Sequence, residues 1–219
     1  MRTMSLFGLE IPTNIHTLAG FRRWVGTLDE RAPRVHYYRG RVHIEMSPQD
    51  YEHHGPVVAA INDVLGPLAR ELAFGRFFEP PSWITDAGSG ISTEPDGFFI
   101  FYDSFRSGRV RINPRRKTEL LGRPDMVLEA VSKTTARKDL VDLMEGYARA
   151  GVPEYWVADT REEKTVFRIL VLSRGGKYRD QKPARGGWIS SPTWRRSFRL
   201  VRFTDPGGLM DCRLEARRR

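Results

Sequence analysis

The feature that most constrains the fold is a run of six residues, Met126–Val131, which reads Met-Val-Leu-Glu-Ala-Val. A near-continuous apolar run of this length is typical of a strand that is buried on both faces of a sheet. Such a sheet needs helices packed against it, so the run predicts a layered α/β fold. Glu129 is the exception within the run. Burying a carboxylate without a partner costs several kcal/mol, so this side chain needs a cation, a metal ion or a wet cleft beside it.

The segments around this strand alternate between the helical period and the strand period. Apolar residues recur at helical spacing over residues 55–74 and 140–148. Two more apolar runs, 155–158 and 166–172, predict buried strands, and the alternation over 35–46 predicts a β-hairpin. This order predicts an α/β fold in which a mixed β-sheet is flanked by helices.

The chain has 219 residues, which suits one domain over 1–219. We expect residues 1–12 to form an N-terminal arm and residues 211–219 a basic tail. The single cysteine, Cys212, cannot form an intrachain disulfide, which fits a reducing compartment. Neither a membrane-spanning apolar run nor a signal-peptide core is recognisable in the sequence. These features predict a cytoplasmic protein with no membrane partner.

Basic residues outnumber acidic ones by 36 to 27, a net charge of +9, which favours an anionic partner such as nucleic acid. Part of this charge is concentrated in the segment 103–122, which we expect to be a loop. Because the segment falls between two candidate acids, Asp96 and Glu129, it is a candidate clamp for DNA phosphates; the alternative is a solvated loop. Its candidate phosphate contacts are Arg109, Arg111, Arg115, Arg116 and Lys117.

Two carboxylates are the candidate metal ligands. Asp96 stands directly before the apolar run 97–101, and Glu129 lies in the central strand. Carboxylates on neighbouring strands repel each other unless a cation lies between them, and Mg²⁺ or Mn²⁺ takes oxygen ligands while keeping several waters. Such an ion can activate water against a phosphodiester. The alternative for Glu129 is a salt bridge to an arginine.

A nearby amine would complete such a site. Lys138, in Arg137-Lys138-Asp139, stands where the next helix begins, and Lys133 is the other choice. An amine there could orient the attacking water, accept its proton or neutralise the phosphate. The alternative for either lysine is a solvated charge at a helix start.

Three further side chains are weaker candidates. Asp125 lies four residues before Glu129, so in a strand it would share the same face of the sheet. It is either a rival to Asp96 or a third carboxylate. His54, at the start of a long helix, could lie near the phosphate. Glu45 alternates with apolar residues of the hairpin, so we expect it to face solvent, with a site-lining acid as the alternative. Zinc is not expected from one cysteine and five histidines without ligand spacing.

Several blocks of the sequence resemble a known family. They are Gly40–Pro48, His54-Gly55, Glu94–Asp96, Gly122–Ser132, Arg137–Asp139, Tyr147 and Ala150–Asp159. In this order they resemble the Uma-two family of restriction endonucleases, within the PD-(D/E)xK superfamily, over residues 35–172. The resemblance implies a restriction-endonuclease-like fold and a divalent-metal-dependent DNA nuclease with metal ligands at Asp96 and Glu129.

The sequence departs from the family pattern at the lysine. The superfamily has a lysine two residues after the acid, where this chain has Val131, and the usual helix lysine of the family falls at Leu143. A subset of the family resembles the Arg-Lys-Asp block seen here, so Lys138 is the substitute. Two functions follow: an endonuclease that hydrolyses DNA phosphodiester bonds, or a weak or inactive nuclease-fold DNA-binding protein. A structural or toxin-like protein is a third hypothesis, and analogy with enzymes that cut both strands suggests a homodimer.

Overall fold

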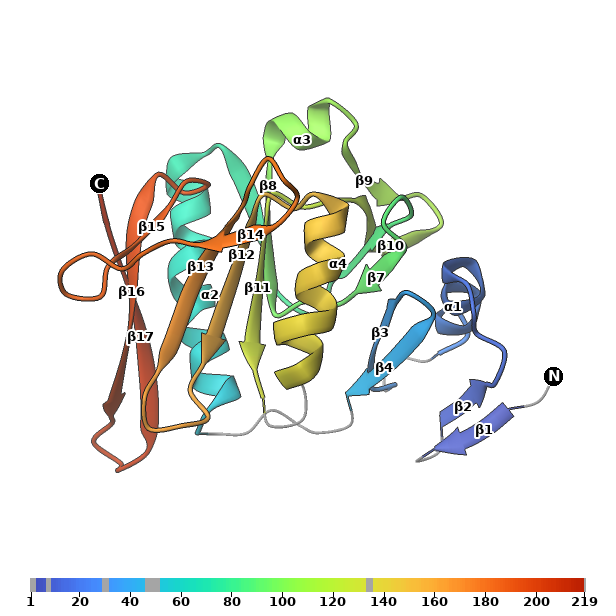
Figure 1. Ribbon diagram of the computed structural model, residues 1–219, viewed down its shortest axis with the longest axis horizontal. Coiled ribbons are helices and arrows are strands. Elements are labelled where there is room, and N and C mark those ends of the chain that lie inside the picture. Colours follow the sequence, from blue (N-terminus) through green and yellow to red (C-terminus); the bar gives the residue numbers. More distant parts are fainter. Residues whose placement is uncertain (1–2, 7–8, 29–31, 46–51, 133–135, 219) are drawn as a thin grey trace.

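The computed structural model describes residues 3–6, 9–28, 32–45, 52–132 and 136–218. A mixed six-stranded sheet forms the centre (Figure 1), and its middle strands β11 and β12 are parallel. In spatial order its strands are β14 (Tyr178–Asp180), β13 (Val166–Leu172), β12 (Glu154–Asp159), β11 (Met126–Val131), β8 (Gly97–Phe101) and β5 (Gly75–Phe78). The predicted fully buried strand is confirmed, because every residue of β11 is buried.

Helices cover both faces of this central sheet. The long helix α2 (His54–Leu72) packs on the face that presents Met126, Leu128 and Ala130. The π-helical turn η1 (Lys138–Asp142) and helix α4 (Leu143–Ala150) pack on the opposite face, against Val127 and Val131. The strand alternation therefore directs Glu129 toward α4.

A second six-stranded sheet lies beside the central sheet. Its strands in spatial order are β4 (Arg41–Glu45), β3 (Arg34–Tyr38), β7 (Ile91–Thr93), β6 (Trp83–Asp86), β10 (Arg116–Gly122) and β9 (Val110–Asn113). The predicted hairpin is confirmed as β3 and β4, which turn through Arg39 and Gly40, both with positive φ. The segment expected as a basic loop is instead the short helix α3 (Tyr102–Arg106) followed by β9 and β10.

The segments predicted as an arm and a basic tail both contain strands. Residues 3–6 and 9–12 form the antiparallel strands β1 (Thr3–Leu6) and β2 (Leu9–Pro12). Leu9 and Ile11 are buried against helix α1 (Leu18–Val25), so apolar contact holds this segment in place. The basic tail is largely β17 (Met210–Arg218), in which the charged residues Asp211, Arg213 and Glu215 alternate with the buried Cys212 and Leu214.

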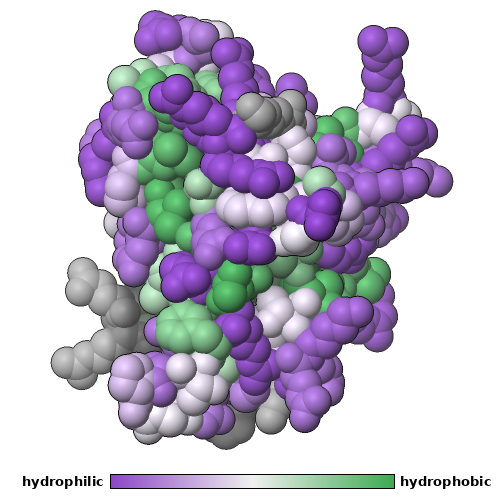
Figure 2. Space-filling model, turned by 90° about the vertical axis from the view of Figure 1, so that its left-hand side faces the viewer, coloured by the Kyte–Doolittle hydropathy of each residue, from purple (hydrophilic) through white to green (hydrophobic). Residues whose placement is uncertain are grey.

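Strand β17 completes a third sheet with β16 (Arg196–Thr204) and β15 (Ile189–Ser191), and α2 packs between it and the central sheet. Figure 2 views the molecule from the side of this third sheet, where hydrophilic side chains surround a strip of apolar ones. Among the described residues, no helix is both long and apolar enough to cross a membrane.

Candidate active site

Two of the predicted acids come together at the end of β11. Strand β8 runs antiparallel to β11, and its pairing ends with Gly97 opposite Leu128. Asp96 directly precedes β8, and its Oδ2 accepts a hydrogen bond of 2.9 Å from the backbone N–H of Ala130. Asp96 and Glu129 are therefore neighbours across two strands. Both are buried, with 3% and 2% of their surfaces exposed.

Asp96 is held as a carboxylate by cationic partners. The Nη1 of Arg34 lies 2.8 Å from Oδ1, and the Nε2 of His54 lies 3.1 Å from Oδ2. Burial opposes ionisation, but the bond to His54 and the charge of Arg34 outweigh it and lower the pKa of Asp96 to about 2. The Asp96 contact also raises the pKa of His54 above its ordinary value, against the effect of burial. His54 thus reaches the site, where its Nε2 contacts an acid.

Glu129 has the opposite electrostatic environment. Burial raises the pKa of its carboxyl well above the ordinary value, and the nearby charges of Asp139 and Asp96 raise it further. The charge of Lys138 and a 2.8 Å hydrogen bond from the Tyr147 hydroxyl favour the ionised form, but they do not offset the rise in the pKa of Glu129. Ionised Glu129 therefore needs more positive charge than the described side chains supply.

Lys138 is the amine at this site. It is the first residue of η1 and is 7% exposed, so it is not a solvated charge at a helix start. Its Nζ contacts Glu45 Oε1 and lies 3.0 Å from Asp139 Oδ1. Burial lowers the pKa of the amine, but the charges of Asp139, Glu129 and Glu45 more than reverse this and raise it. The group stays an ammonium, which favours orienting water or neutralising phosphate over accepting a proton. The other choice, Lys133, lies outside the described residues.

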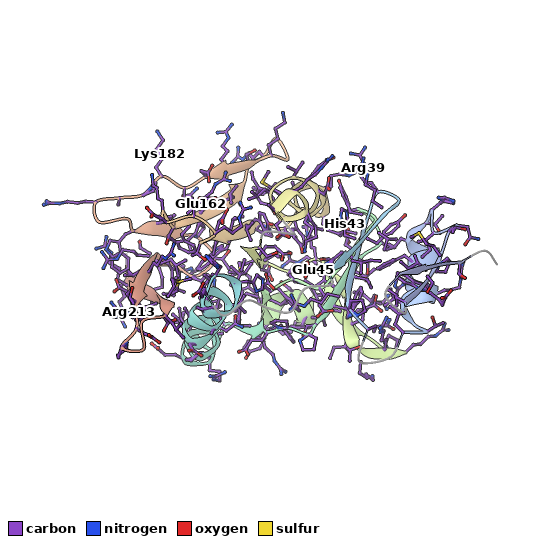
Figure 3. The ribbon with its side chains drawn as sticks, turned by 90° about the horizontal axis from the view of Figure 1, so that it is seen from below. Arg39, His43, Glu45, Glu162, Lys182 and Arg213 are labelled. Atoms are coloured by element: carbon purple, nitrogen blue, oxygen red, sulfur yellow. The ribbon has the colours of Figure 1, made fainter. Side chains whose placement is uncertain are left out.

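Glu45 faces the site, so the expectation that it faces solvent is wrong. The apolar residues of β4, Val42 and Ile44, pack toward the N-terminal cluster around α1. Glu45 is consequently turned toward the central sheet, where His36 Nε2 lies 3.1 Å from its Oε1. Burial opposes its ionisation, but His36 and Lys138 hold the pKa of Glu45 well below its ordinary value. In Figure 3 Glu45 lies near the middle of the view, whereas Arg39 and Lys182 extend outward near its rim.

Sequence reasoning missed several residues of this site. Arg34 bridges Asp96 and Glu94, with its Nε 3.2 Å from Glu94 Oε1. Glu94 belongs to the same Glu-Pro-Asp motif as Asp96, and this spacing was the available signal. Burial raises the pKa of Glu94. The remaining residues that were missed are His36, Thr93, Asp139 and Tyr147. Asp139 and Tyr147 stand in the blocks that resemble the family, whereas no sequence pattern singles out His36 or Thr93.

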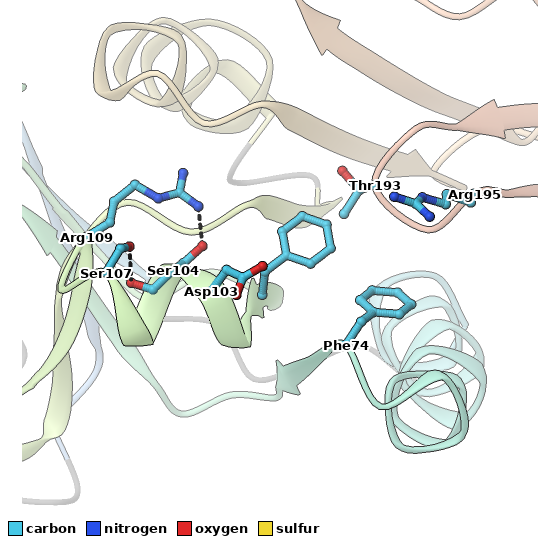
Figure 4. Close-up of a pocket in the computed structure, with 8 residues that line it drawn as sticks. Phe74, Asp103, Ser104, Ser107, Arg109, Thr193 and Arg195 are labelled. Atoms are coloured by element: carbon cyan, nitrogen blue, oxygen red, sulfur yellow. Dashed lines mark hydrogen bonds between the residues drawn. The ribbon is translucent and has the colours of Figure 1, made fainter.

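Asp125 does not join this site. Its carboxylate accepts hydrogen bonds from the Phe101 N–H at 2.8 Å and the Ser104 hydroxyl at 2.7 Å, and it pairs with Arg109. These partners lie at the opposite end of β8 from Asp96, beside a cavity of about 530 Å³ (Figure 4). Asp125 therefore joins α3 to β11, and it is neither a rival to Asp96 nor a third carboxylate there.

The basic segment also leaves from the far end of β8. Asp96 precedes this five-residue strand and α3 follows it, a separation of about 17 Å at roughly 3.3 Å per residue. Strand β9 is the edge of the second sheet opposite β4. The expectation that this segment borders the acids is therefore wrong. Arg109 pairs with Asp125, Arg116 stacks 5.4 Å over the Trp83 ring, and the exposed residues are Arg111, Arg115 and Lys117.

The donor set suits a hard divalent cation. Asp96 and Glu129 offer carboxylate oxygens, which are the ligands that Mg²⁺ and Mn²⁺ prefer. Within the described ranges, no three histidine, cysteine or acidic side chains converge as a metal-binding group. Two carboxylates and bound waters are nevertheless a common Mg²⁺ arrangement, and a cation beside Glu129 would favour the ionised form that burial opposes.

A mixed α/β sheet with two buried acids and an ammonium near one strand end is the arrangement that the resemblance to restriction endonucleases implies. Comparison with known proteins agrees: a family model described as "Putative restriction endonuclease" (Uma2) matches residues 18–200. The chain therefore belongs to the Uma2, or Uma-two, family, as its sequence blocks predict.

A solved structure shares this fold. It is the crystal structure of a "putative nuclease belonging to DUF820" from Anabaena variabilis, with a TM-score of 0.59 and 17% sequence identity. The match covers 81% of this chain and 90% of that chain, which confirms the predicted fold class. No curated protein matches the sequence. Family and fold together support a nuclease.

Proposed function

We propose that the protein is a metal-dependent endonuclease that hydrolyses DNA phosphodiester bonds at Asp96, Glu129 and Lys138. The observation that carries this proposal is the environment of Glu129. Its buried carboxyl lies beside Asp96, and burial, together with the charges of Asp139 and Asp96, raises its pKa well above the ordinary value. An acid kept in such a place by the fold has a use for an added cation.

Asp96 and Glu129 would hold Mg²⁺ or Mn²⁺. Such an ion, when bound, supplies Lewis-acid polarisation of the phosphate and makes a bound water more acidic. Arg34 and His54 keep Asp96 ionised and oriented. The Lys138 ammonium neutralises charge that develops on the phosphate and orients the attacking water, because Glu45 and Asp139 keep it protonated.

A DNA substrate is supported by the family and by the net charge of +9. The test is cleavage of supercoiled plasmid and of single-stranded DNA with Mg²⁺, with Mn²⁺ and with a chelator. We expect cleavage only with metal, and no cleavage by Asp96→Ala or Glu129→Ala proteins whose circular dichroism matches the parent. Unchanged cleavage by both variants would end the site assignment.

Lys138 has a matched control in its exposed neighbour Arg137. We expect Lys138→Met to lower the cleavage rate by about 10²-fold, the scale for removing one electrostatic contact in a transition state, with little change in DNA affinity. Arg137→Met should leave the rate unchanged. Single-turnover cleavage and fluorescence anisotropy separate the two quantities. An equal loss of rate and affinity in Lys138→Met would make Lys138 only a phosphate contact.

The second candidate is a DNA-binding protein with the nuclease fold and little or no activity. The observation in its favour is Leu143, which is fully buried in the apolar core at the position of the usual family lysine. No cleavage with any metal, together with DNA binding that weakens steeply with salt, would select this function. The absence of salt-dependent binding would argue against both candidates.

A further inference from the structure

Two acids of the site are connected through a line of buried hydrogen-bonding groups. From Glu129 Oε1 the first step is the Tyr147 hydroxyl at 2.8 Å, and the second is Thr93 Oγ1, 3.3 Å further. Thr93 Oγ1 lies 2.8 Å from His36 Nδ1. The other ring nitrogen of His36, Nε2, lies 3.1 Å from Glu45 Oε1, a close contact rather than an aligned hydrogen bond, and that same oxygen contacts the Lys138 ammonium.

The three connecting residues come from three different elements. Tyr147 belongs to α4, Thr93 to β7 and His36 to β3, and each is at most 1% exposed. Buried polar groups in folded proteins are nearly always partnered, and such networks specify one arrangement of the side chains that they join. Here the network joins the central sheet to the second sheet across the site.

The direction of hydrogen bonding in the line is set by one backbone group. The N–H of Glu94 donates to His36 Nδ1 at 3.4 Å, and a backbone amide cannot reverse its role. Nδ1 is therefore the acceptor, and Nε2 carries the proton that faces the Glu45 carboxylate. The low pKa of His36, about 4 because of burial and the charge of Lys138, agrees with one neutral tautomer.

Tyr147 has a single hydroxyl hydrogen and two acceptors within reach. It lies closer to Glu129 than to Thr93, by 2.8 Å against 3.3 Å. Thr93 in turn donates its own hydrogen to His36 Nδ1, which leaves an oxygen lone pair for Tyr147. The orientation of Glu129 thus depends on a hydroxyl whose alternative partner is fixed by His36.

We propose that Tyr147, Thr93 and His36 are positioning residues that orient the metal-binding acid Glu129 and the Glu45–Lys138 pair as one unit. This inference rests on the proposed function for the roles of Glu129 and Lys138, but the contacts of the network do not depend on cleavage. Removing its middle member therefore disturbs both ends of the site, although Thr93 touches neither the ion nor the ammonium.

The test is Thr93→Val, which keeps the shape and removes the hydroxyl, against Thr93→Ser, which keeps the hydroxyl. We expect Thr93→Val to weaken Mn²⁺ binding, measured by titration calorimetry, by about 10-fold or more, the range for outer-shell partners of metal ligands. Its turnover should fall with KM for DNA unchanged, and Thr93→Ser should remain within about 2-fold of the parent. Equal Mn²⁺ affinities in the two variants would overturn the proposal.

A double-mutant cycle tests whether the two ends are one unit. In the double variant, Tyr147→Phe and His36→Gln should change the free energy of unfolding and of Mn²⁺ binding by less than the sum of their separate changes. Each substitution interrupts the same line, so the second has less left to disrupt. Simple additivity would overturn the proposal. If the parent binds no Mn²⁺ and cleaves nothing, the proposed function fails. The network is then still tested by the unfolding cycle and by ¹⁵N NMR of His36, which should show the ring proton on Nε2.

Discussion

Two buried glutamates on adjacent strands show how differently this fold treats the same side chain. Glu129 lies on β11 and Glu154 begins the parallel strand β12, and both are almost completely buried. Glu154 accepts hydrogen bonds from Ser191 at 2.5 Å, from Trp156 at 2.5 Å and from the Thr193 N–H at 3.0 Å. Glu129 has a hydrogen bond from Tyr147 and, nearby, two acids and one ammonium.

Burial raises the pKa of both carboxyls, so burial does not distinguish a functional acid from a structural one. The partners do. Neutral donors from β12, from the end of β15 and from Thr193 just after it satisfy Glu154, which connects the central sheet to the third sheet. Glu129 faces other charges that the fold brings together, which is the arrangement that an added cation would complete.

The largest expected contrast is in cleavage. Glu129→Gln should lower the rate by more than about 10²-fold, because outer-shell changes alone cost 10- to 100-fold and this one removes a direct ligand. Glu154→Gln should cleave at the parental rate per folded molecule. Both are measured in the same plasmid assay with Mg²⁺. Equal rates for the two variants would remove the distinction between these acids.

The contrast reverses for stability. Glu154→Leu leaves the Ser191 hydroxyl and the Thr193 N–H without their acceptor, so it should lower the free energy of unfolding by about 2–3 kcal/mol. Glu129→Gln should fold as well as the parent or better, because repulsion from Asp96 is relieved. Urea unfolding without metal measures both. A large loss in Glu129→Gln would identify a structural ion pair instead.

The pH dependence of stability separates Glu129 from its neighbour Asp96. The pKa of Asp96 is lowered to about 2 from 3.8, so its contribution to stability is present above pH 3.8 and is lost as the pH falls through about 2. The raised pKa of Glu129 has the opposite sign, and stability falls as the pH rises above 4.5. Asp96→Asn should flatten the acid side of the urea-unfolding profile, and Glu129→Gln the other side; identical profiles would contradict these signs.

The smallest expected effect concerns the basic segment. Arg111, Arg115 and Lys117 are exposed, so neutralising all three should leave stability unchanged and reduce the salt dependence of DNA binding by up to about three phosphate contacts. Arg109→Gln should instead destabilise the protein, since Arg109 pairs with the buried Asp125. An unaltered salt slope in the triple variant would show that this segment does not contact DNA.

Periodicity predicted the layers of this fold because it records which face of each element is apolar. Residues 126–131, the helices over 55–74 and 140–148 and the hairpin of 35–46 all appear close to their expected bounds. The expected arm and tail contain the strands β1, β2 and β17, whose short apolar alternations bury Leu9, Ile11, Cys212 and Leu214.

What the sequence by itself determined was the need for a partner at Glu129, since a carboxylate in an apolar strand cannot be left uncompensated. Only the tertiary structure decided which charged groups surround Glu129. Arg34 and Glu45 come from one hairpin, Lys138 comes from a segment about a hundred residues later, and sheet pairing and helix packing bring the three together near the end of β11. Spacing along a chain encodes local geometry, whereas the charge balance of a buried site is a sum over all the elements that enclose it.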